Sequence, residues 1–363
     1  MKTNPAFKSS GLNPDPSELL QDETIDIKLL RELKGQSILS VHQFTKEMVC
    51  EISKLAALLQ CTKVSDYNPL QGQIIITAFF EPSTRTRLSF ESAVHRLDGK
   101  VISIPEGKTT GVAKGESLSD IGEMFNAYGD AVVIRHTETD SLDLIGENLR
   151  IPLINAGNGS GEHPTQALAD WFAILKWKPE LKQASIPEDK KIHLGILGTP
   201  ASMRTVNSFL RMSLLFKDNI KKISIVSELA NPFGEELQEL INNSGVEFEI
   251  NNDIKEVLPD LDVVYMNSIA FLGDNYRSLD SNFKIDSKSK LKKDAVVLHP
   301  LARLDELDTT LDSTRHNLYF TQAHGAVFIR QALFISVLDR FGKLPIEEIN
   351  EAVTPALELE LTT

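Results

Sequence analysis

The stretch "IIITAFFEPSTRTRLSFESAVHRLDG", residues 74–99, joins an apolar run to a run rich in hydroxyl and arginine side chains. The apolar part contains many β-branched residues and predicts a buried strand, and the segment after Pro82 predicts the start of a helix. Backbone N–H groups at a helix start are unpaired and carry the positive end of the helix dipole, so phosphate binds there readily. The junction is therefore a candidate phosphate site.

Side chains of the same segment strengthen this prediction. Ser83, Thr84 and Thr86 carry hydroxyl donors, and the planar guanidinium of Arg85 matches the oxygens of a phosphate. The segment has no glycine-rich loop, so side chains have to hold the anion. The alternative is an ordinary N-cap followed by solvated arginines, because Ser and Thr are common caps.

Similar apolar runs alternate with helical patterns along most of the chain. The predicted strands are "QIIITAFF", "KVISIP", "DAVVI", "IPLINA", "KIHLGILG", "KISIVS", "VEFEI", "DVVYM" and "AVVLH". Short strands separated by helices are typical of parallel sheets, and 363 residues exceed what one hydrophobic core usually covers. The predicted fold class is α/β, with two doubly wound parallel-sheet domains.

The predicted domains follow changes of composition along the chain. Residues 1–34 are expected to form a mobile N-terminal extension, because the first part of this range has no apolar period. The first domain is expected over 35–176 and the second over 177–323, which begins with a polar connection containing two prolines. The helical pattern 324–341 is apolar on more than one face and is expected to pack back on the first domain.

Composition disfavours several classes of protein. The net charge of −13 argues against a general nucleic-acid binder, since such proteins carry an excess of Lys and Arg. We expect a cytoplasmic protein, because the chain has neither the roughly 20 consecutive apolar residues of a membrane span nor the apolar block of a signal peptide. The two cysteines, Cys50 and Cys61, suit neither a metal site nor a disulfide framework.

Two further segments place polar residues after predicted strands. Arg135 directly follows "DAVVI", and ligands of open α/β sheets bind outside the carboxyl ends of strands. The glycine-rich loop in "INAGNGSGEHPTQALADWF" ends at His163, with Gln166 one turn into the next helix. A dinucleotide site is disfavoured because the G-x-G-x-x-G pattern and its later acidic residue are missing.

These segments together resemble the catalytic chains of the aspartate carbamoyltransferase family. The resemblance runs from about residue 35 to about residue 343 and is carried by "FFEPSTRTRLSFESAVHRLDG", "AKGESLSD", "VVIRH", "NAGNGSGEHPTQALADWF", "VVYM", "VVLHPLARLDELD" and "YFTQAHGAVFIRQAL". The Ser-Thr-Arg-Thr-Arg and His-Pro-Thr-Gln motifs belong to the wider aspartate and ornithine carbamoyltransferase superfamily. His-Pro-Leu and "RQAL" look like the aspartate branch.

The resemblance implies transfer of the carbamoyl group of carbamoyl phosphate to an amine, with release of phosphate, as in pyrimidine biosynthesis. It implies that the first domain binds carbamoyl phosphate and the second an amino acid. The residues implied to bind the phosphate are Ser83, Thr84, Arg85 and Thr86. Those implied to contact the carbonyl oxygen are Thr86, Arg135 and His163. The carbamoyl NH2 is implied to be held by Gln166 and by the main-chain carbonyls of Pro300 and Leu301.

The resemblance also implies a homotrimer with shared active sites. In the family a loop of the neighbouring chain covers each site, and "EGKTTGVAKGE" matches that loop, so Lys114, with Thr110 as a further candidate, is implied to act in a neighbour's site. The implied ligands are carbamoyl phosphate and an amino-acid or amine acceptor, without nucleic acid or membrane. The chemistry needs no metal or cofactor, only two aligned substrates and a stabilised oxyanion.

The acceptor half departs from the family. Arg204 is kept where the family binds a carboxylate of aspartate, but the Arg and Gln that hold the side-chain carboxylate are replaced by Ser268 and Ala270. A buried carboxylate without a charged partner is strongly disfavoured. Next to Leu301, Ala302 also stands where the family has a proline in a cis bond. A cis bond without proline is unfavourable, so this acceptor-site loop is either trans and reshaped or still cis.

Three hypotheses follow for the acceptor. In the first, Arg277 or another nearby Arg replaces the missing one, and the acceptor is aspartate. In the second, the pocket is rebuilt for a different carboxylated amine, an interpretation favoured because two polar contacts and the loop proline changed together. The third, a non-catalytic paralogue with a regulatory or binding role, is disfavoured because every position implied to bind carbamoyl phosphate is intact.

Overall fold

The computed structural model describes residues 9–21, 24–267, 271–272, 275–276, 281–344 and 346. Contacts divide these residues into two compact units. The first contains the described residues of 15–165 together with those from 326 onwards, and the second contains 9–14 and the described residues of 166–325.

The first unit is built on a four-stranded parallel sheet with the strand order β2-β1-β3-β4. The strands are β1 (Ile74–Phe79), β2 (Lys100–Ile104), β3 (Ala131–His136) and β4 (Leu153–Asn158). The register pairs Phe79 at the end of β1 with Arg135 near the end of β3. The segments that follow these two strands therefore leave the sheet side by side.

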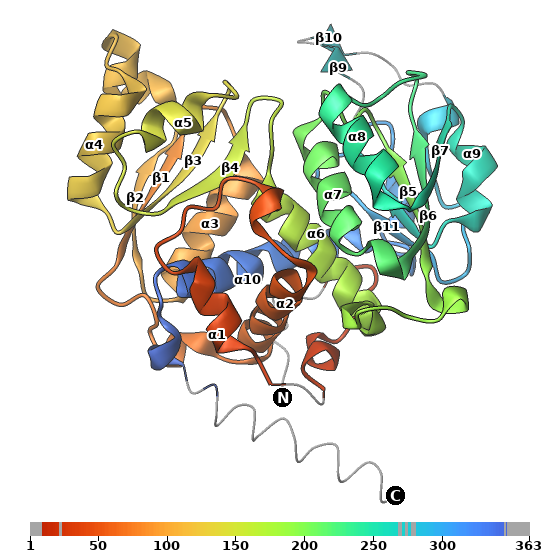
Figure 1. Ribbon diagram of the computed structural model, residues 1–363, viewed down its shortest axis with the longest axis horizontal. Helices are drawn as coiled ribbons and strands as arrows, with labels where there is room; N and C mark the ends of the chain where they lie inside the picture. Colours follow the sequence, from red (N-terminus) through yellow and green to blue (C-terminus); the bar gives the residue numbers. More distant parts are fainter. Residues whose placement is uncertain are drawn as a thin grey trace, which may run out of the picture. The chain divides into compact units, whose positions relative to one another are not determined.

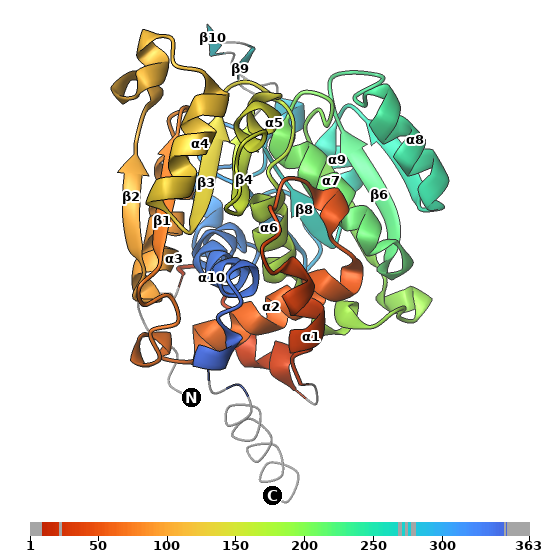
Figure 2. The same ribbon diagram turned by 60° about the vertical axis from the view of Figure 1, so that its left-hand side comes forward.

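Helices cover both faces of this sheet (Figure 1, Figure 2). The helices of the unit are α1 (Ile27–Leu30), α2 (Lys46–Cys61), α3 (Thr84–Arg96), α4 (Leu118–Tyr128), α5 (Ser141–Gly146) and the second half of α10 (Tyr319–Val337). Ile76 and Ile134 pack with Phe125 of α4 on one face. On the other side, Phe90 of α3 meets Phe334 of α10, with ring centroids 6.0 Å apart. The sheet is thus doubly wound, as predicted.

The described part of residues 1–34 is packed, where a mobile extension was expected. Pro16–Leu20 forms a short 3-10 helix that contacts α2, and Leu19 and Leu30 are both 0 % exposed. These leucines bury apolar area that a free tail would leave in water. Sequence composition did not reveal this, because the leucines are few and lie among polar residues.

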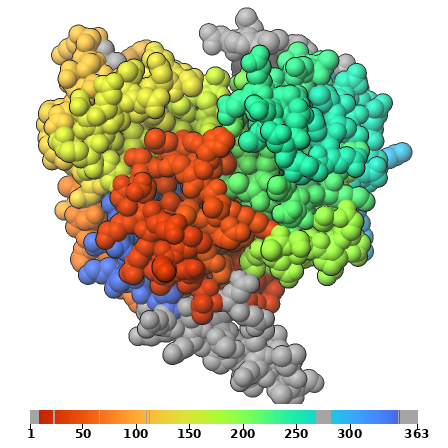
Figure 3. All heavy atoms as spheres, in the orientation of Figure 1, coloured from red at the N-terminus to blue at the C-terminus, as the bar shows by residue number. Residues whose placement is uncertain are grey.

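Polar contacts fix the same segment to the end of α10. The carboxylate of Asp339 pairs with Arg31 at 3.0 Å and with Lys34 at 2.8 Å, and the Gly35 N–H donates to the Val337 carbonyl at 2.8 Å. Figure 3 shows red atoms of the N-terminal part of the chain beside blue atoms of its described C-terminal part.

The second unit contains a five-stranded parallel sheet with the order β11-β8-β5-β6-β7. Its strands are β5 (Ile192–Leu197), β6 (Ile220–Val226), β7 (Glu247–Asn251), β8 (Val263–Tyr265) and β11 (Val296–Leu298), and its helices include α7 (Arg204–Leu215), α8 (Glu235–Ser244) and α9 (Ile254–Val257). A separate antiparallel pair consists of β9 (Phe271–Leu272) and β10 (Asn275–Tyr276). All nine predicted strands are present, and the α/β prediction with two parallel sheets is confirmed.

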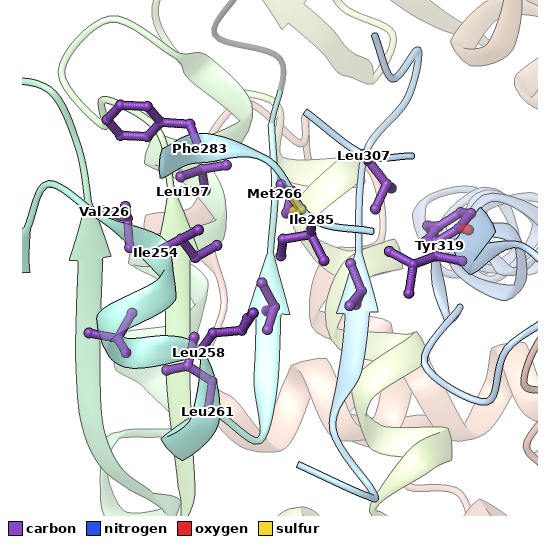
Figure 4. Close-up of a cluster of buried hydrophobic side chains, with 14 residues drawn as sticks. Leu197, Val226, Ile254, Leu258, Leu261, Met266, Phe283, Ile285, Leu307 and Tyr319 are labelled. Atoms are coloured by element: carbon purple, nitrogen blue, oxygen red, sulfur yellow. The ribbon is translucent and has the colours of Figure 1, made fainter. Parts of the chain in front are cut away.

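Successive residues of β8 and its end serve opposite faces of the second sheet. Met266 belongs to the apolar cluster of Figure 4, where it lies with Ile254 and Leu258. Tyr265 points the other way, as alternation requires, and its ring stacks on Phe209 of α7 at 3.8 Å between centroids.

The chain changes unit inside two helices. Helix α6 (Pro164–Trp177) joins the second unit from Gln166, and α10 returns to the first unit at Ala326. The boundary near residue 176 expected from sequence differs from this division because Trp171 of α6 stacks on Phe216, with centroids 3.8 Å apart. None of the helices in the described ranges combines the length and apolar character that crossing a bilayer requires.

We expect Leu19→Ala to lower the free energy of unfolding by about 2–4 kcal/mol, because it leaves a cavity under the N-terminal segment. Urea unfolding followed by circular dichroism measures this change. Leu144→Ala is the matched control, since Leu144 is 40 % exposed in the same unit and should change stability little. Equal effects of the two substitutions would show that the N-terminal segment does not contribute to the core.

Candidate active site

The phosphate candidate lies at the start of α3. Strand β1 ends at Phe79, α3 begins at Thr84, and Ser83 is the N-cap residue. The Ser83 side chain makes no capping hydrogen bond to the helix, and its Oγ instead accepts from Nη1 of Arg135 at 3.2 Å. Ser83 therefore leaves the first turn of α3 uncapped, which is what an anion site at a helix start requires.

Glu81 holds Arg135 in this place. Nη2 of Arg135 donates to Oε1 of Glu81 at 2.7 Å, and the two side chains are only 13 % and 25 % exposed. The parallel register that pairs Phe79 with Arg135 brings these residues together. Sequence reasoning found Ser83 and Arg135 but missed Glu81, although an acidic residue two positions before the N-cap of an anion site is a usable signal.

The two arginines of the opening stretch have different surroundings. Arg87 donates to Glu91 at 3.5 Å and to Ser103 of β2 at 3.3 Å. Glu91 also accepts from the hydroxyls of Ser103 and Thr77, at 2.7 and 3.1 Å. Arg87 thus joins α3 to the sheet and is not available for a ligand.

Arg85 is the available member of the pair. Within the described ranges its guanidinium has no hydrogen bond or ion pair, although desolvation lowers its pKa below the usual value. An arginine remains charged after such a shift. The structure therefore distinguishes two residues that the sequence alone leaves equivalent.

The other candidates of the first unit occupy varied environments. Thr84 is exposed and Thr86 buried in the first turn of α3, and His163 is 2 % exposed, with its Nδ1 3.4 Å from the hydroxyl of Thr165. Lys114 ends the 3-10 turn Gly111–Lys114 and is exposed, and its ammonium has no partner within the part of the chain that the structure describes. The hydroxyl of Thr110 donates to the Gly107 carbonyl at 2.7 Å.

The acceptor candidates lie at the carboxyl edge of the second sheet. Because β11, β8 and β5 are neighbours and parallel, the segments after them leave the same edge. Arg204 begins α7 after β5, and Asn267 after β8 donates to the hydroxyl of Thr205 at 3.1 Å. Ser268, Ala270 and Arg277 lie outside the described residues.

The segment after β11 contains the carbonyls proposed to hold the carbamoyl NH2. The Leu301–Ala302 bond is cis, which decides between the two geometries left open by the sequence. The Leu301 N–H donates to Nδ1 of His299 at 2.8 Å. Gln166 donates from Nε2 to Oδ1 of Asp170 at 2.6 Å. The sequence analysis did not name His299 or Asp170 as site residues. Asp170 lies four residues after Gln166 on the same face of a helix, and this spacing indicates a contact between the two side chains.

Two family models match this chain. One describes the aspartate/ornithine carbamoyltransferase carbamoyl-P binding domain and matches residues 36–176, and the other describes the Asp/Orn binding domain and matches residues 190–337. The chain belongs to the aspartate/ornithine carbamoyltransferase family. The resemblance found in the motifs is thereby confirmed, and the chain is a carbamoyltransferase.

Relatives in this family align with most of this chain. The aspartate carbamoyltransferase catalytic subunit of Pyrobaculum islandicum is 37 % identical over 311 residues, which are 84 % of this chain and 99 % of the relative. The chloroplastic aspartate carbamoyltransferase of Arabidopsis thaliana is 35 % identical over 314 residues, or 84 % of this chain and 78 % of the relative. The structure of aspartate transcarbamoylase from Trypanosoma cruzi with carbamoyl phosphate and aspartate matches with a TM-score of 0.72 and 33 % identity, over 85 % of this chain and 98 % of that one.

The contrast between Arg85 and Arg87 predicts opposite effects of two similar substitutions. Arg85→Ala should weaken the binding of inorganic phosphate about 10-fold or more, with little change in stability, because its guanidinium has no structural partner to lose. Arg87→Ala should lower the free energy of unfolding by about 1–2 kcal/mol and leave phosphate affinity nearly unchanged. Titration calorimetry and urea unfolding measure the two quantities. Similar losses of affinity in both variants would contradict this division.

Proposed function

We propose that this chain transfers the carbamoyl group of carbamoyl phosphate to the amine of L-aspartate and releases inorganic phosphate. The observation that carries the proposal is the contact of Arg135 with Ser83 at the start of α3, in a chain with the family's full set of phosphate and carbonyl candidates. The named relatives, which are aspartate carbamoyltransferases, favour aspartate as the acceptor.

In the proposed mechanism the phosphate binds at the first turn of α3. Ser83, Thr84, Arg85 and Thr86 hold its oxygens through hydroxyl and guanidinium donors. Arg135 and His163, with Thr86, donate to the carbonyl oxygen, where negative charge grows as the amine attacks. The amine attacks in its unprotonated form, the new C–N bond forms while the C–O bond to phosphate breaks, and the departing phosphate takes the proton that the amine loses.

The carbamoyl NH2 and the acceptor are assigned to the second unit. The side-chain oxygen of Gln166 and the carbonyls of Pro300 and Leu301 accept from the NH2, which orients the carbonyl carbon for attack. Arg204, at the start of α7, binds a carboxylate of the acceptor. Leu301 and Ala302 flank the same site, and Lys114 of a neighbouring chain in a homotrimer completes it.

A second candidate function is carbamoyl transfer to a different carboxylated amine. The observation that favours it is the replacement of the family's Arg and Gln by Ser268 and Ala270, which takes away the expected partner of the aspartate side chain. Arg204 would still select a carboxylate in that acceptor.

Supplying carbamoyl phosphate with a panel of amino acids tests both candidates, with phosphate release and the ureido product as readouts. We expect turnover with millimolar L-aspartate, and Arg204→Ala should raise the KM for it by roughly 10- to 100-fold without a similar change for carbamoyl phosphate, because one charged contact is lost.

Arg211→Ala is the matched control for Arg204→Ala. Arg211 lies on the same helix, but its guanidinium donates to Asn207 at 2.6 Å and to Glu236 at 3.0 Å. Its loss should change stability and not the KM for the acceptor. Turnover only with another amine would replace aspartate by the second candidate, and turnover with none would contradict both.

Mixing inactive variants tests the shared site. Arg85→Ala and Lys114→Ala chains, unfolded and reassembled together in equal amounts, should regain activity at about a quarter of the sites, because each site then draws on two chains of a cyclic trimer. Activity of the mixture is compared with that of each variant alone. The control mixture of Arg85→Ala with Arg135→Ala should regain none, since both residues belong to one chain's half of the site. Equal behaviour of the two mixtures would contradict a shared site.

A further inference from the structure

Asp170 is a buried carboxylate on which two side-chain amides converge. It is 0 % exposed, and its Oδ1 accepts from Nε2 of Gln166 at 2.6 Å and from Nε2 of Gln322 at 2.5 Å. All three residues belong to the second unit. In both contacts the amide nitrogen donates and the carboxyl oxygen accepts, so both amides turn their nitrogen towards Asp170.

This contact fixes which end of Gln166 faces away from the core. With Nε2 at Asp170, the amide oxygen Oε1 is turned away from Asp170, and within the described residues it accepts no hydrogen bond. Gln166 itself is only partly buried. An NH2 group of a substrate needs an oxygen acceptor, whereas the flipped amide would present a second NH2. The orientation imposed by Asp170 is therefore the one that can bind an amide donor.

Gln322 connects Asp170 to the segment after β11 by hydrogen bonds. It is 0 % exposed, and its Oε1 accepts from the backbone N–H of His299 at 2.9 Å. Both ends of this amide are thus occupied, by Asp170 and by His299. His299 directly precedes Pro300 and Leu301. Asp170, which orients Gln166, therefore also helps to fix the position of His299 through Gln322.

The ring of His299 fixes the segment a second time. Its Nδ1 accepts from the Leu301 N–H at 2.8 Å, so the proton lies on Nε2, which donates to Oε1 of Glu306 at 2.8 Å. Glu306 also accepts from the Leu304 N–H at 2.8 Å. Burial alone would raise the pKa of Glu306, but these hydrogen bonds outweigh it and hold the pKa below the usual value. The far end of the network is therefore a charged carboxylate.

We propose that Asp170 is a positioning residue that gives the enzyme its preference for a carbamoyl over an acyl group. Through Gln166 on one side and the relay of Gln322 and His299 on the other, it sets the oxygen acceptors that meet the NH2 of carbamoyl phosphate. This inference rests on the proposed function. A site built to bond an NH group discriminates strongly against an analogue that lacks it, because its own polar groups are then left unpaired.

Acetyl phosphate separates this role from a merely structural one. It carries the same phosphate and carbonyl groups, but a methyl group replaces the NH2, so it gains nothing from the oriented acceptors. A substitution that only loosens the fold would weaken the binding of both compounds alike. A substitution that disturbs the oxygen acceptors would weaken only the interaction with carbamoyl phosphate, because acetyl phosphate has no NH2 group to donate.

We expect Asp170→Ala to lower kcat/KM for carbamoyl phosphate by roughly 10- to 100-fold, while the inhibition constant of acetyl phosphate changes less than about threefold. Asp170→Asn should restore most of the loss, because one amide oxygen can still accept from both glutamines. Should the Ala variant fail to fold, Gln322→Met cuts the relay with a side chain of similar size, and we expect the same selective loss in smaller degree.

Ser213→Ala is the matched control. Ser213 is also 0 % exposed and accepts from Trp171 of α6 at 3.2 Å, next to Asp170, but it has no bond to the network in the described residues. It should lower stability and leave the ratio of the two constants unchanged. Equal changes for both phosphates, no change in the Ala or Met variant, or an Asn variant as poor as Ala would each overturn the proposal. Wild-type turnover is measured first, so a failure of the proposed function is recognised separately.

Discussion

Parallel pairing is the constraint on which the chemistry of both units depends. Every strand of each main sheet runs in the same direction, so all strands of one sheet end at one edge. In the first unit this brings Arg135 to Ser83, and in the second it aligns the segments that carry Arg204 and Pro300. The apolar strands supply stability, while the segments after them carry the polar residues.

Burial decides which polar residues remain for a ligand. A buried charge or amide must find a partner within the protein. Arg87 is engaged by Glu91, and Asp170 engages two glutamines, so their contribution is to hold other groups in place. Arg85 and the oxygen of Gln166 have no such partner in the described residues, and these are the groups assigned to the substrate. Donors and acceptors fixed before binding need no reorganisation during the reaction.

Local signals explain what could be predicted. Each of the nine strands lies in a short segment rich in apolar residues, which can be recognised from neighbouring residues alone. The packed segment around Leu19 was missed, because a few leucines among polar residues show no period. The division by contacts at Gln166 depends on the stacking of Trp171 with Phe216, residues of two different helical patterns, and neither pattern shows it alone.

The sequence by itself determined the α/β class, the family and the candidate residues, because strand runs and motifs are read from neighbours along the chain. Only the tertiary structure decided that Arg85 rather than Arg87 is available, that the Leu301–Ala302 bond is cis, and which end of Gln166 faces away from Asp170. The reason is that the partners concerned are distant in sequence: Ser103 for Arg87, and Gln322 for Asp170. Folding brings these distant residues together, and their hydrogen bonds then determine which polar atoms are already paired and which can bind a substrate.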